Sequence, residues 1–367
     1  RLARDGHAVH LFASNWDAIA LPASTVYHPI PAPTGPRFLR PWRFAAGCLE
    51  ALRANPVDVS MGFDKTWGQD TLYPQGGLHS ASRAHSLLKH SPGLARGAAA
   101  FVRLLDPTSY SFAKLERRQY LIARPPVILA ISEMVRRHFR EYLGVPNSDV
   151  RVLHAAIDPD RFAADDRPAR RERERRVWGA APDDAVGLFV GMNYRLKGLG
   201  PLLRAFAEVP RERKVRLAIV GGNRFGRYKA LARRLGVADR VRFLGFRADP
   251  RDAYFAADFL VHPTFYDPCS LVVLEALACG LPVITSEYNG ARELFREPDE
   301  GLVIRDPHDA TALAKATAEI ADPQTLPARK IAAAAAGRRW TFEDHYRQLL
   351  TVFEEVVARK RGATLAA

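Results

Sequence analysis

The stretch that decides the fold is AADFLVHPTFYDPCSLVVLEALACGLPVITSEYNG, residues 256–290. The apolar run 259–261 predicts a buried strand, and residues 271–278 predict a short helix that packs its apolar side chains against a sheet. Gly280 suits the left-handed end of a helix, and residues 282–285, which start with a proline, predict the next strand. A strand, a helix and a strand in this order indicate a parallel sheet with a right-handed crossover.

Two carboxylates, Asp267 and Glu275, lie on either side of the start of this helix. The helix would begin at the carboxyl edge of the sheet, where α/β proteins bind ligands. Its first N–H groups, at Ser270, Leu271 and Val272, would suit a phosphate. A plainer interpretation makes Asp267 only a helix cap and Glu275 only a solvated residue. Glu275, however, belongs to a helix that is otherwise almost wholly apolar, where a carboxylate is costly without a partner such as a hydroxyl-rich ligand.

Composition limits the class of protein. With 367 residues, 47% of them apolar, the chain is expected to form two domains with full cores. No run of about 18 uncharged apolar residues occurs, so we expect no membrane-spanning helix, and no signal peptide is recognised. The three cysteines have no metal or disulfide spacing and the eleven histidines form no ligand cluster, so we predict a cytoplasmic protein without a structural metal.

The net charge of +14 includes a strong basic excess in the first half of the chain. Residues 83–141 hold eleven lysines and arginines against four acids. A solvated helix surface explains such an excess, and so does a face for an anionic membrane or a phosphorylated acceptor, because clustered cations attract both. Nucleic acid is the weaker alternative, since no stacking platform or recognised motif accompanies the charge, and we expect no nucleic-acid partner.

Strand and helix signals alternate in two blocks, which predicts an α/β fold with two doubly wound, Rossmann-like domains. The first block, residues 1–160, has strand signals at 9–13, 57–62, 127–131 and 150–154, and helix signals over 101–122. The second block, residues 161–338, opens with a linker and a charged helix over 159–185. Its expected strands are 186–190, 215–220, 241–243 and 259–261. Its expected helices are 199–207, 228–235, 250–256 and 310–335. Residues 339–360 contain a final amphipathic helix. The opening RLARDGHAVHLFAS reads as the end of a helix and a second strand, so we expect the first strand and its glycine turn to be missing.

Several phrases together resemble a known family. VGMNYRLKGLGPLLRAF (190–206), LAIVGG (217–222), VRFLGF (241–246) and the unit from Asp267 to Glu275 followed by GLPVITS resemble glycosyltransferase family 4, whose members are retaining enzymes of GT-B architecture. FYDPCSLVVLEA, FAKLERRQY (112–120) and VLHAAIDPDRF (152–162) are similar to the lipopolysaccharide core glucosyltransferases of that family. The resemblance implies two domains facing a central cleft, with the last helix crossing back to the first domain.

The resemblance also implies roles for individual residues. Lys197 matches the lysine that binds the donor phosphates, and Arg195 would be a second cation. The leaving diphosphate gains charge as the glycosidic bond breaks, and a preorganised cation stabilises that charge. The family pattern is a Glu, seven residues and a Glu; here the first acid is Asp267, assigned to sugar hydroxyls, and the second is Glu275, assigned to the nucleotide ribose. Asp is one methylene shorter than Glu, so a changed sugar preference would be one consequence.

Four further residues match by context. Gly221 and Gly222 end a strand and would let the backbone approach the ligand closely. Phe246 lies where the family holds the nucleotide base by backbone contacts. In the first domain, His79 follows Gly76-Gly77 in an expected polar loop, TLYPQGGLHSASRAH (71–85), and would hydrogen-bond the transferred sugar or the acceptor. An ordinary exposed loop histidine is the alternative.

These features predict a retaining transferase that moves a hexose, with glucose from UDP-glucose as the first choice, onto a lipopolysaccharide-core or other lipid-linked or oligosaccharide acceptor. We expect no cofactor and no metal, since no DxD-like carboxylate pair would position one and Lys197 and Arg195 supply the charge. An enzyme at the inner face of the plasma membrane would meet such acceptors. A nucleotide-sugar epimerase of the same architecture, or a degenerate binding protein suggested by Asp267, are the alternatives.

Overall fold

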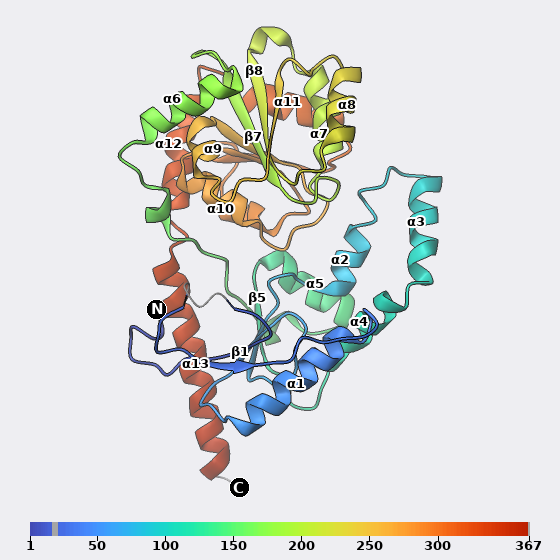
Figure 1. The fold of residues 1–367 in the computed structure, drawn as a ribbon, viewed down its shortest axis with the longest axis vertical. Coiled ribbons are helices and arrows are strands. Elements are labelled where there is room, and N and C mark those ends of the chain that lie inside the picture. The colour runs from blue at the N-terminus through green and yellow to red at the C-terminus, as the bar shows by residue number, and fades with distance from the viewer. Residues whose placement is uncertain (17–20, 366–367) are drawn as a thin grey trace.

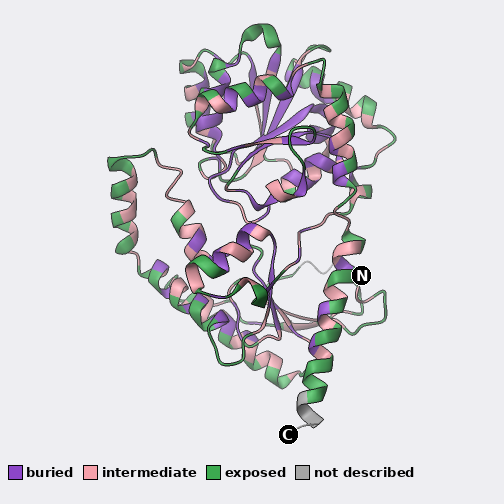
Figure 2. Cartoon of the chain, turned by 180° about the vertical axis from the view of Figure 1, so that it is seen from behind, coloured by how far each residue is buried: buried purple, intermediate pink, exposed green. Residues whose placement is uncertain are grey.

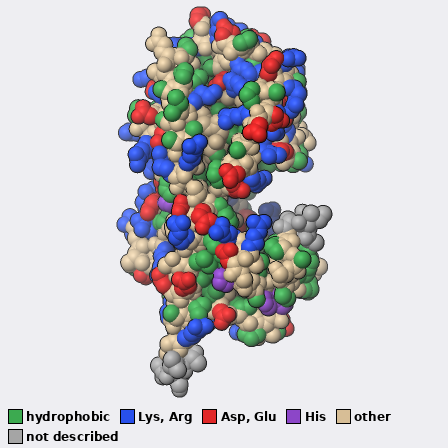
Figure 3. All heavy atoms as spheres, turned by 90° about the vertical axis from the view of Figure 1, so that its left-hand side faces the viewer, with side chains coloured by type: hydrophobic (Ala, Val, Ile, Leu, Met, Phe, Trp, Pro, Cys, Tyr) green, Lys and Arg blue, Asp and Glu red, His purple; other side chains and the backbone are tan. Residues whose placement is uncertain are grey.

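The structure, a computed structural model, describes residues 1–16 and 21–365, with side chains described up to residue 362. Two α/β lobes are joined by a narrow waist, which is visible in the ribbon and on the molecular surface (Figures 1 and 3). Every strand pairing in both lobes is parallel. The predicted α/β class with two doubly wound domains is therefore confirmed.

The first domain contains two parallel sheets. β1 (His10–Ala13) pairs with β2 (Val26–Pro29), and a second sheet has the order β3 (Met61–Phe63), β4 (Thr71–Tyr73), β5 (Val127–Ala130), β6 (Val150–Val152). Its helices are α1 (Arg40–Ala54), α2 (His79–His85), α3 (Leu94–Leu104), α4 (Pro107–Tyr120) and α5 (Glu133–Leu143). α3 stands away from the body of this domain, beside the other lobe (Figure 1).

The second domain contains one sheet of six strands in the order β12-β11-β10-β7-β8-β9. The strands are β7 (Ala185–Gly191), β8 (Val215–Gly221), β9 (Val241–Gly245), β10 (Phe259–His262), β11 (Val283–Ser286) and β12 (Gly301–Ile304). The helices are α6 (Arg167–Trp178), α7 (Leu199–Glu208), α8 (Gly226–Arg234), α9 (Arg251–Ala256), α10 (Leu271–Ala278), α11 (Ala310–Ile320) and α12 (Leu326–Gly337). The strand order reverses between β7 and β10, and such a switch point is where doubly wound sheets bind ligands.

Burial is deepest along this second sheet, in which β7, β8, β10 and β11 are almost entirely buried (Figure 2). All four residues of β10 are buried, which agrees with its continuous apolar sequence and its central position. The loops at the carboxyl ends of β7 and β10 are therefore held on a rigid base.

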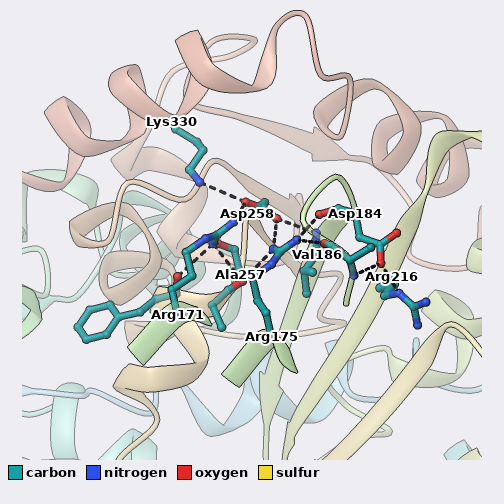
Figure 4. Close-up of polar contacts among 11 residues, drawn as sticks. Arg171, Arg175, Asp184, Val186, Arg216, Ala257, Asp258 and Lys330 are labelled. Atoms are coloured by element: carbon teal, nitrogen blue, oxygen red, sulfur yellow. Dashed lines mark hydrogen bonds and ion pairs between the residues drawn. The ribbon is translucent and has the colours of Figure 1, made fainter. Parts of the chain in front are cut away.

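A buried ion-pair network fastens the linker helix α6 to this domain (Figure 4). The Asp258 carboxylate accepts from Arg171 at 2.7 Å, from Arg175 at 2.9 Å and from Lys330 at 3.2 Å. It also accepts from the N–H of Val186 at 2.9 Å. Burial alone would raise the pKa of Asp258, but the neighbouring cations, Arg171 first, hold that pKa below its ordinary value.

The last helix, α13 (Phe342–Leu365), leaves the second domain and runs along the first (Figure 1). Val352 and Val356 are buried, and Glu355 pairs with Arg151 at 2.6 Å. The predicted helix crossing back to the first domain is thus confirmed. Within the described residues, no helix combines the length and apolarity needed to cross a membrane.

Some local expectations were wrong. Residues 71–85, expected as a polar loop, contain the buried strand β4 and the helix α2. The strand expected over 57–62 begins only at Met61, and the helix expected over 310–335 is two helices, α11 and α12. β2 and β12 were not expected at all. The missed strands are three or four residues long, too short for a periodic pattern to stand out.

Candidate functional site

The candidate site lies where β7 and β10 end, at the switch point of the second sheet. Lys197 follows β7 on a short loop, and Asp267 follows β10. Gly198 has a φ of +77°, and a Cβ there would lie 2.0 Å from the carbonyl oxygen of Pro263. Only glycine therefore allows the Lys197 loop to pack directly on the loop after β10.

Asp267 is the centre of the polar contacts. Its Oδ2 forms an ion pair with Nζ of Lys197 and accepts a hydrogen bond from Oγ of Ser270. The Nε2 atom of His262, the last residue of β10, lies 3.8 Å from the same oxygen. The Lys197 and Asp267 side chains are only 20% and 14% exposed, so their attraction is weakly screened.

These neighbours set the ionisation state of Asp267. Burial alone would raise the pKa of this carboxyl, but His262 and Lys197 hold it well below its ordinary value. Burial lowers the pKa of His262, so that ring is neutral at pH 7. The site at neutral pH therefore combines an anionic Asp267 with the cation of Lys197.

Asp267 does not cap the helix, which corrects the plainer interpretation. α10 begins at Leu271, with Ser270 at the N-cap position and no side chain capping it. The N–H of Ser270 donates to Oδ1 of Asn289 at 3.3 Å, so it is already engaged. Within the described chain, no acceptor meets the N–H groups of Leu271 and Val272, which remain available to a phosphate.

Glu275, in the second turn of α10, has a partner other than a ligand. The hydroxyl of the buried Tyr254 donates to Oε2 of Glu275 at 2.5 Å. Burial raises the pKa of Glu275, and this hydrogen bond opposes the rise. The tyrosine satisfies one carboxylate oxygen, which leaves the other for a ligand hydroxyl.

Gly221, the last residue of β8, and Gly222 after it are explained by local packing. Gly221 has a φ of +145°, and a Cβ there would lie 1.9 Å from the carbonyl oxygen of Gly191 on β7. A Cβ on Gly222 would lie 3.1 Å from the carbonyl oxygen of Met192. Close packing of the two loops therefore explains these glycines without a ligand. The N–H of Phe246 donates to Oδ1 of Asn223 at 3.0 Å, and Phe246 as a residue is 58% exposed.

Arg195 points elsewhere. Its guanidinium donates to Nδ1 of His90 in the first domain at 2.8 Å. No contact between described residues joins it to Lys197 or Asp267. The resemblance places both Arg195 and Lys197 at the donor diphosphate. In the structure the two side chains point to different surroundings, and of the two only Lys197 contacts Asp267.

The first domain faces this site through the turn at Gly77. A Cβ on Gly77 would lie 2.5 Å from the hydroxyl of Tyr266 and 2.9 Å from Cγ of Pro268. The turn therefore abuts the Asp267 loop. Ser132 also bridges the domains, because its hydroxyl donates to the carbonyl oxygen of Pro268 at 2.7 Å.

His79 is the first residue of α2 and does not lie in a polar loop. Its Nε2 is buried without a hydrogen-bond partner among described residues, and its ring meets the edge of Phe112. Burial, followed by the charges of Lys65 and Arg83, lowers the pKa of His79 to about 4. His79 is therefore neutral at pH 7.

Sequence reasoning missed three polar residues near these elements. His262 could have been found, because it ends a buried strand at the ligand-binding edge of the sheet. Glu116 accepts from the N–H groups of His79 and Ser80 at 2.5 and 3.2 Å and so holds the start of α2. Glu293 accepts from the first two N–H groups of α5, across the domain boundary, at 2.7 and 2.8 Å. No sequence pattern links these last two acids to helices so distant along the chain.

No cluster of candidate metal ligands occurs in the part of the chain that the structure describes. No group of three or more His, Cys, Asp or Glu side chains there is arranged to hold an ion. Lys197, Asp267 and the start of α10 supply charge at this site.

Comparison with known proteins agrees with this architecture. The family model "Glycosyltransferase Family 4" matches residues 1–161, and "Glycosyl transferases group 1" matches residues 170–337. The lipopolysaccharide glucosyltransferase WaaG of Escherichia coli K12 is 24% identical over 308 residues, which cover 83% of this chain and 79% of WaaG.

Solved structures give the same fold. A crystal structure of WaaG, a glycosyltransferase involved in lipopolysaccharide biosynthesis, matches 97% of this chain and 92% of its own with a TM-score of 0.75 at 22% identity. Anabaena HepE in complex with UDP-glucose matches 90% of this chain and 86% of its own with a TM-score of 0.65 at 21% identity. The chain therefore has the GT-B fold and belongs to the glycosyltransferases of family 4, with a second domain of the group 1 type.

Proposed function

We propose that this glycosyltransferase moves glucose from UDP-glucose to a lipopolysaccharide-core or other lipid-linked oligosaccharide acceptor, with retention of the anomeric configuration. The ion pair of Lys197 and Asp267 at the switch point is the observation that carries the proposal. The similarity to WaaG supports the acceptor class, and the UDP-glucose bound by HepE supports the donor.

In this proposal the donor replaces the internal ion pair with two sets of contacts. The diphosphate takes the cation of Lys197 and the free N–H groups at the start of α10. The sugar hydroxyls donate to the Asp267 carboxylate, which is ionised at neutral pH. The ribose hydroxyl meets the oxygen of Glu275 that Tyr254 does not occupy. The base meets the backbone of Phe246.

In the chemical step that we propose, the leaving phosphate itself accepts the proton of the acceptor. The acceptor hydroxyl attacks the anomeric carbon on the face from which the diphosphate departs. The bond from that carbon to the phosphate oxygen breaks, its electron pair stays on the diphosphate, and the acceptor proton passes to the same oxygen. Lys197 stabilises the charge that grows on the leaving group.

Exposed apolar side chains on a basic helix support a peripheral position at an anionic membrane. α3 has no buried residue (Figure 2). Leu94 is 94% exposed and Phe101 is 63% exposed, and the helix also carries Arg96 and Arg103. A helix of this composition binds membrane interfaces through apolar insertion and attraction to anionic lipid. We propose that α3 brings the enzyme to a lipid-linked acceptor.

A donor screen tests the proposal. Purified protein is assayed with UDP-glucose, UDP-galactose, UDP-N-acetylglucosamine and GDP-mannose on a truncated lipopolysaccharide core, and the anomeric configuration of the product is read by NMR. We expect the highest kcat/KM with UDP-glucose and a product that retains the α configuration. Inversion, or failure to transfer from every one of these donors, would contradict the proposal.

A further inference from the structure

A second polar surface lies between the two domains and is distinct from the pair of Lys197 and Asp267. It is a groove of about 450 Å³. The loop after α2 contributes Lys89 and Ser91, and the second domain contributes Arg195 and residues of α7 and α8. Its cationic lining residues are Lys89, Arg195, Arg204, Arg227 and Arg234.

The positive charge of this groove is not balanced locally. None of the residues that line it is acidic. Among the ion pairs of the described chain, none includes any of these five cations. Burial, followed by the charges of Arg103 and Arg195, lowers the pKa of Lys89. By contrast, Lys/Arg and Asp/Glu side chains are intermixed on the face of the second domain shown in Figure 3. Like charges held together in this way repel one another, and an anion between them would remove that cost.

Contacts across the domain boundary hold the two walls of the groove together. Nε2 of His308, which also lines it, donates to the carbonyl oxygen of Leu88 at 2.7 Å. Arg195 donates to His90 at 2.8 Å. Within the second domain, Nη2 of Arg227 donates to the hydroxyl of Tyr228 at 2.7 Å, which fixes its guanidinium over α8. Arg195 and Arg227 are therefore positioned before any ligand arrives, which reduces the entropy lost on binding.

We propose that this groove binds phosphate groups of a multiply phosphorylated ligand. Four of the five cations are arginines, whose planar guanidinium groups match phosphate oxygens in pairs. A single carboxylate would neutralise only one of the five cations that line this groove of 450 Å³, whereas several phosphate groups would neutralise more of them. The phosphates can belong to the glycan acceptor or to a free polyphosphate, and binding to both walls would favour the closed arrangement of the domains. The acceptor source rests on the proposed function; the binding of phosphate does not.

Direct binding is tested with inorganic pyrophosphate as the probe. The full chain is first saturated with UDP so that the site at Lys197 is filled, and pyrophosphate is then titrated by calorimetry. The test variant is Arg204→Gln with Arg234→Gln. The control is Arg233→Gln with Arg242→Gln, which removes the same charge from exposed arginines of the same domain that do not line the groove. We expect the test variant to lose at least tenfold in affinity and the control to stay within twofold.

A second arm identifies the source of the phosphate. The KM for a truncated lipopolysaccharide acceptor is measured before and after the acceptor is treated with alkaline phosphatase. If the acceptor supplies the phosphates, the test variant raises this KM at least tenfold for the untreated acceptor only, with the KM for UDP-glucose unchanged. If the variant weakens pyrophosphate binding but leaves both acceptor KM values unchanged, the groove binds a free anion.

Two results would overturn the proposal. One is that pyrophosphate does not bind to the UDP-saturated wild-type protein. The other is equal loss of affinity in the test and control variants, which would indicate only a general effect of net charge. A protein that transfers no sugar but binds pyrophosphate through Arg204 and Arg234 would refute the proposed function and leave the groove assignment standing.

Discussion

At the scale of single residues, Asp267 stands where the resemblance predicts a glutamate, and the structure gives the shorter side chain a defined environment. Lys197, Ser270 and His262 surround its carboxylate on a loop packed between the two domains. The depressed pKa means that protonation of Asp267 does not limit activity near neutral pH. Its contribution to stability is present above the unfolded-state pKa and is lost only as the pH falls through the lower folded-state value.

Glu275 has the opposite pH dependence. Burial raises its pKa, so the folded protein binds this proton more tightly than the unfolded chain and loses stability as the pH rises through the folded-state pKa. Glu275→Gln cannot lose a proton. We expect its Tm relative to wild type to increase between pH 4 and pH 7, as measured by scanning calorimetry. Glu212→Gln, at an exposed position of the same domain, is the control and should show no such trend. A difference for Glu275→Gln that is independent of pH would refute the assignment.

The charge supplied by Lys197 predicts activity without a metal. Transfer from UDP-glucose should keep its rate in excess EDTA, because a lysine in place of a divalent ion neutralises the diphosphate. The measurement is the initial rate of UDP release with EDTA, with added Mg²⁺ and with added Mn²⁺. Complete loss in EDTA that either ion restores would contradict this account.

At the scale of elements, α6 is joined to the second domain through Asp258. Replacing this acid by alanine leaves Arg171, Arg175 and Lys330 together without their counter-charge, and breaking a buried pair in this way costs about 3–5 kcal/mol. We expect Asp258→Ala to lower the free energy of unfolding in urea by that amount. Asp183→Ala removes a partner of Lys214 from an exposed pair and should leave the midpoint almost unchanged. Equal midpoints for the two variants would show that the network is not stabilising.

The predicted binding to an anionic membrane depends on α3. Phe101→Ser with Leu104→Ser removes two exposed apolar side chains, each worth about 1.5–3 kcal/mol when buried in an apolar phase. We expect co-sedimentation with vesicles of phosphatidylethanolamine and phosphatidylglycerol to weaken at least tenfold. The exposed Ile331 on α12 provides the control, since Ile331→Ser should change nothing. Unaltered binding of the double variant, or equal binding to vesicles without phosphatidylglycerol, would exclude α3 as the anchor.

The elements also show how far sequence alone reaches. The strands and loops around Asp267 were predictable because β7 and β10 are continuous apolar runs, β8 is interrupted only by Arg216, and all three end in glycine or a polar residue. β4 was missed because its three residues lie beside a glycine turn that dominates the local pattern. The capping of α2 by Glu116 and of α5 by Glu293 could not be predicted, because each pairs residues brought together only by tertiary packing.

At the scale of the whole molecule, the two domains meet through a few specific contacts. Glu293 reaches from the second domain to the start of α5, Ser132 reaches from the first to Pro268, and α13 binds the first domain. This arrangement brings the turn at Gly77 against the Asp267 loop, so closing the domains would exclude water from the donor. Sequence predicted the two domains and the returning helix, while the residues that join the domains became visible only in the folded protein.

The central claim is that Lys197 holds the diphosphate of a nucleotide sugar at the switch point of the second sheet. The affinity for UDP of the wild-type protein, Lys197→Ala and the exposed control Lys315→Ala, measured by isothermal titration, tests it most directly. A charge-assisted contact to phosphate is worth about 1.5–3 kcal/mol, so Lys197→Ala should bind UDP at least tenfold more weakly, with the control unchanged. Equal affinity of Lys197→Ala and wild type, or no binding of UDP by the wild-type protein, would contradict the account.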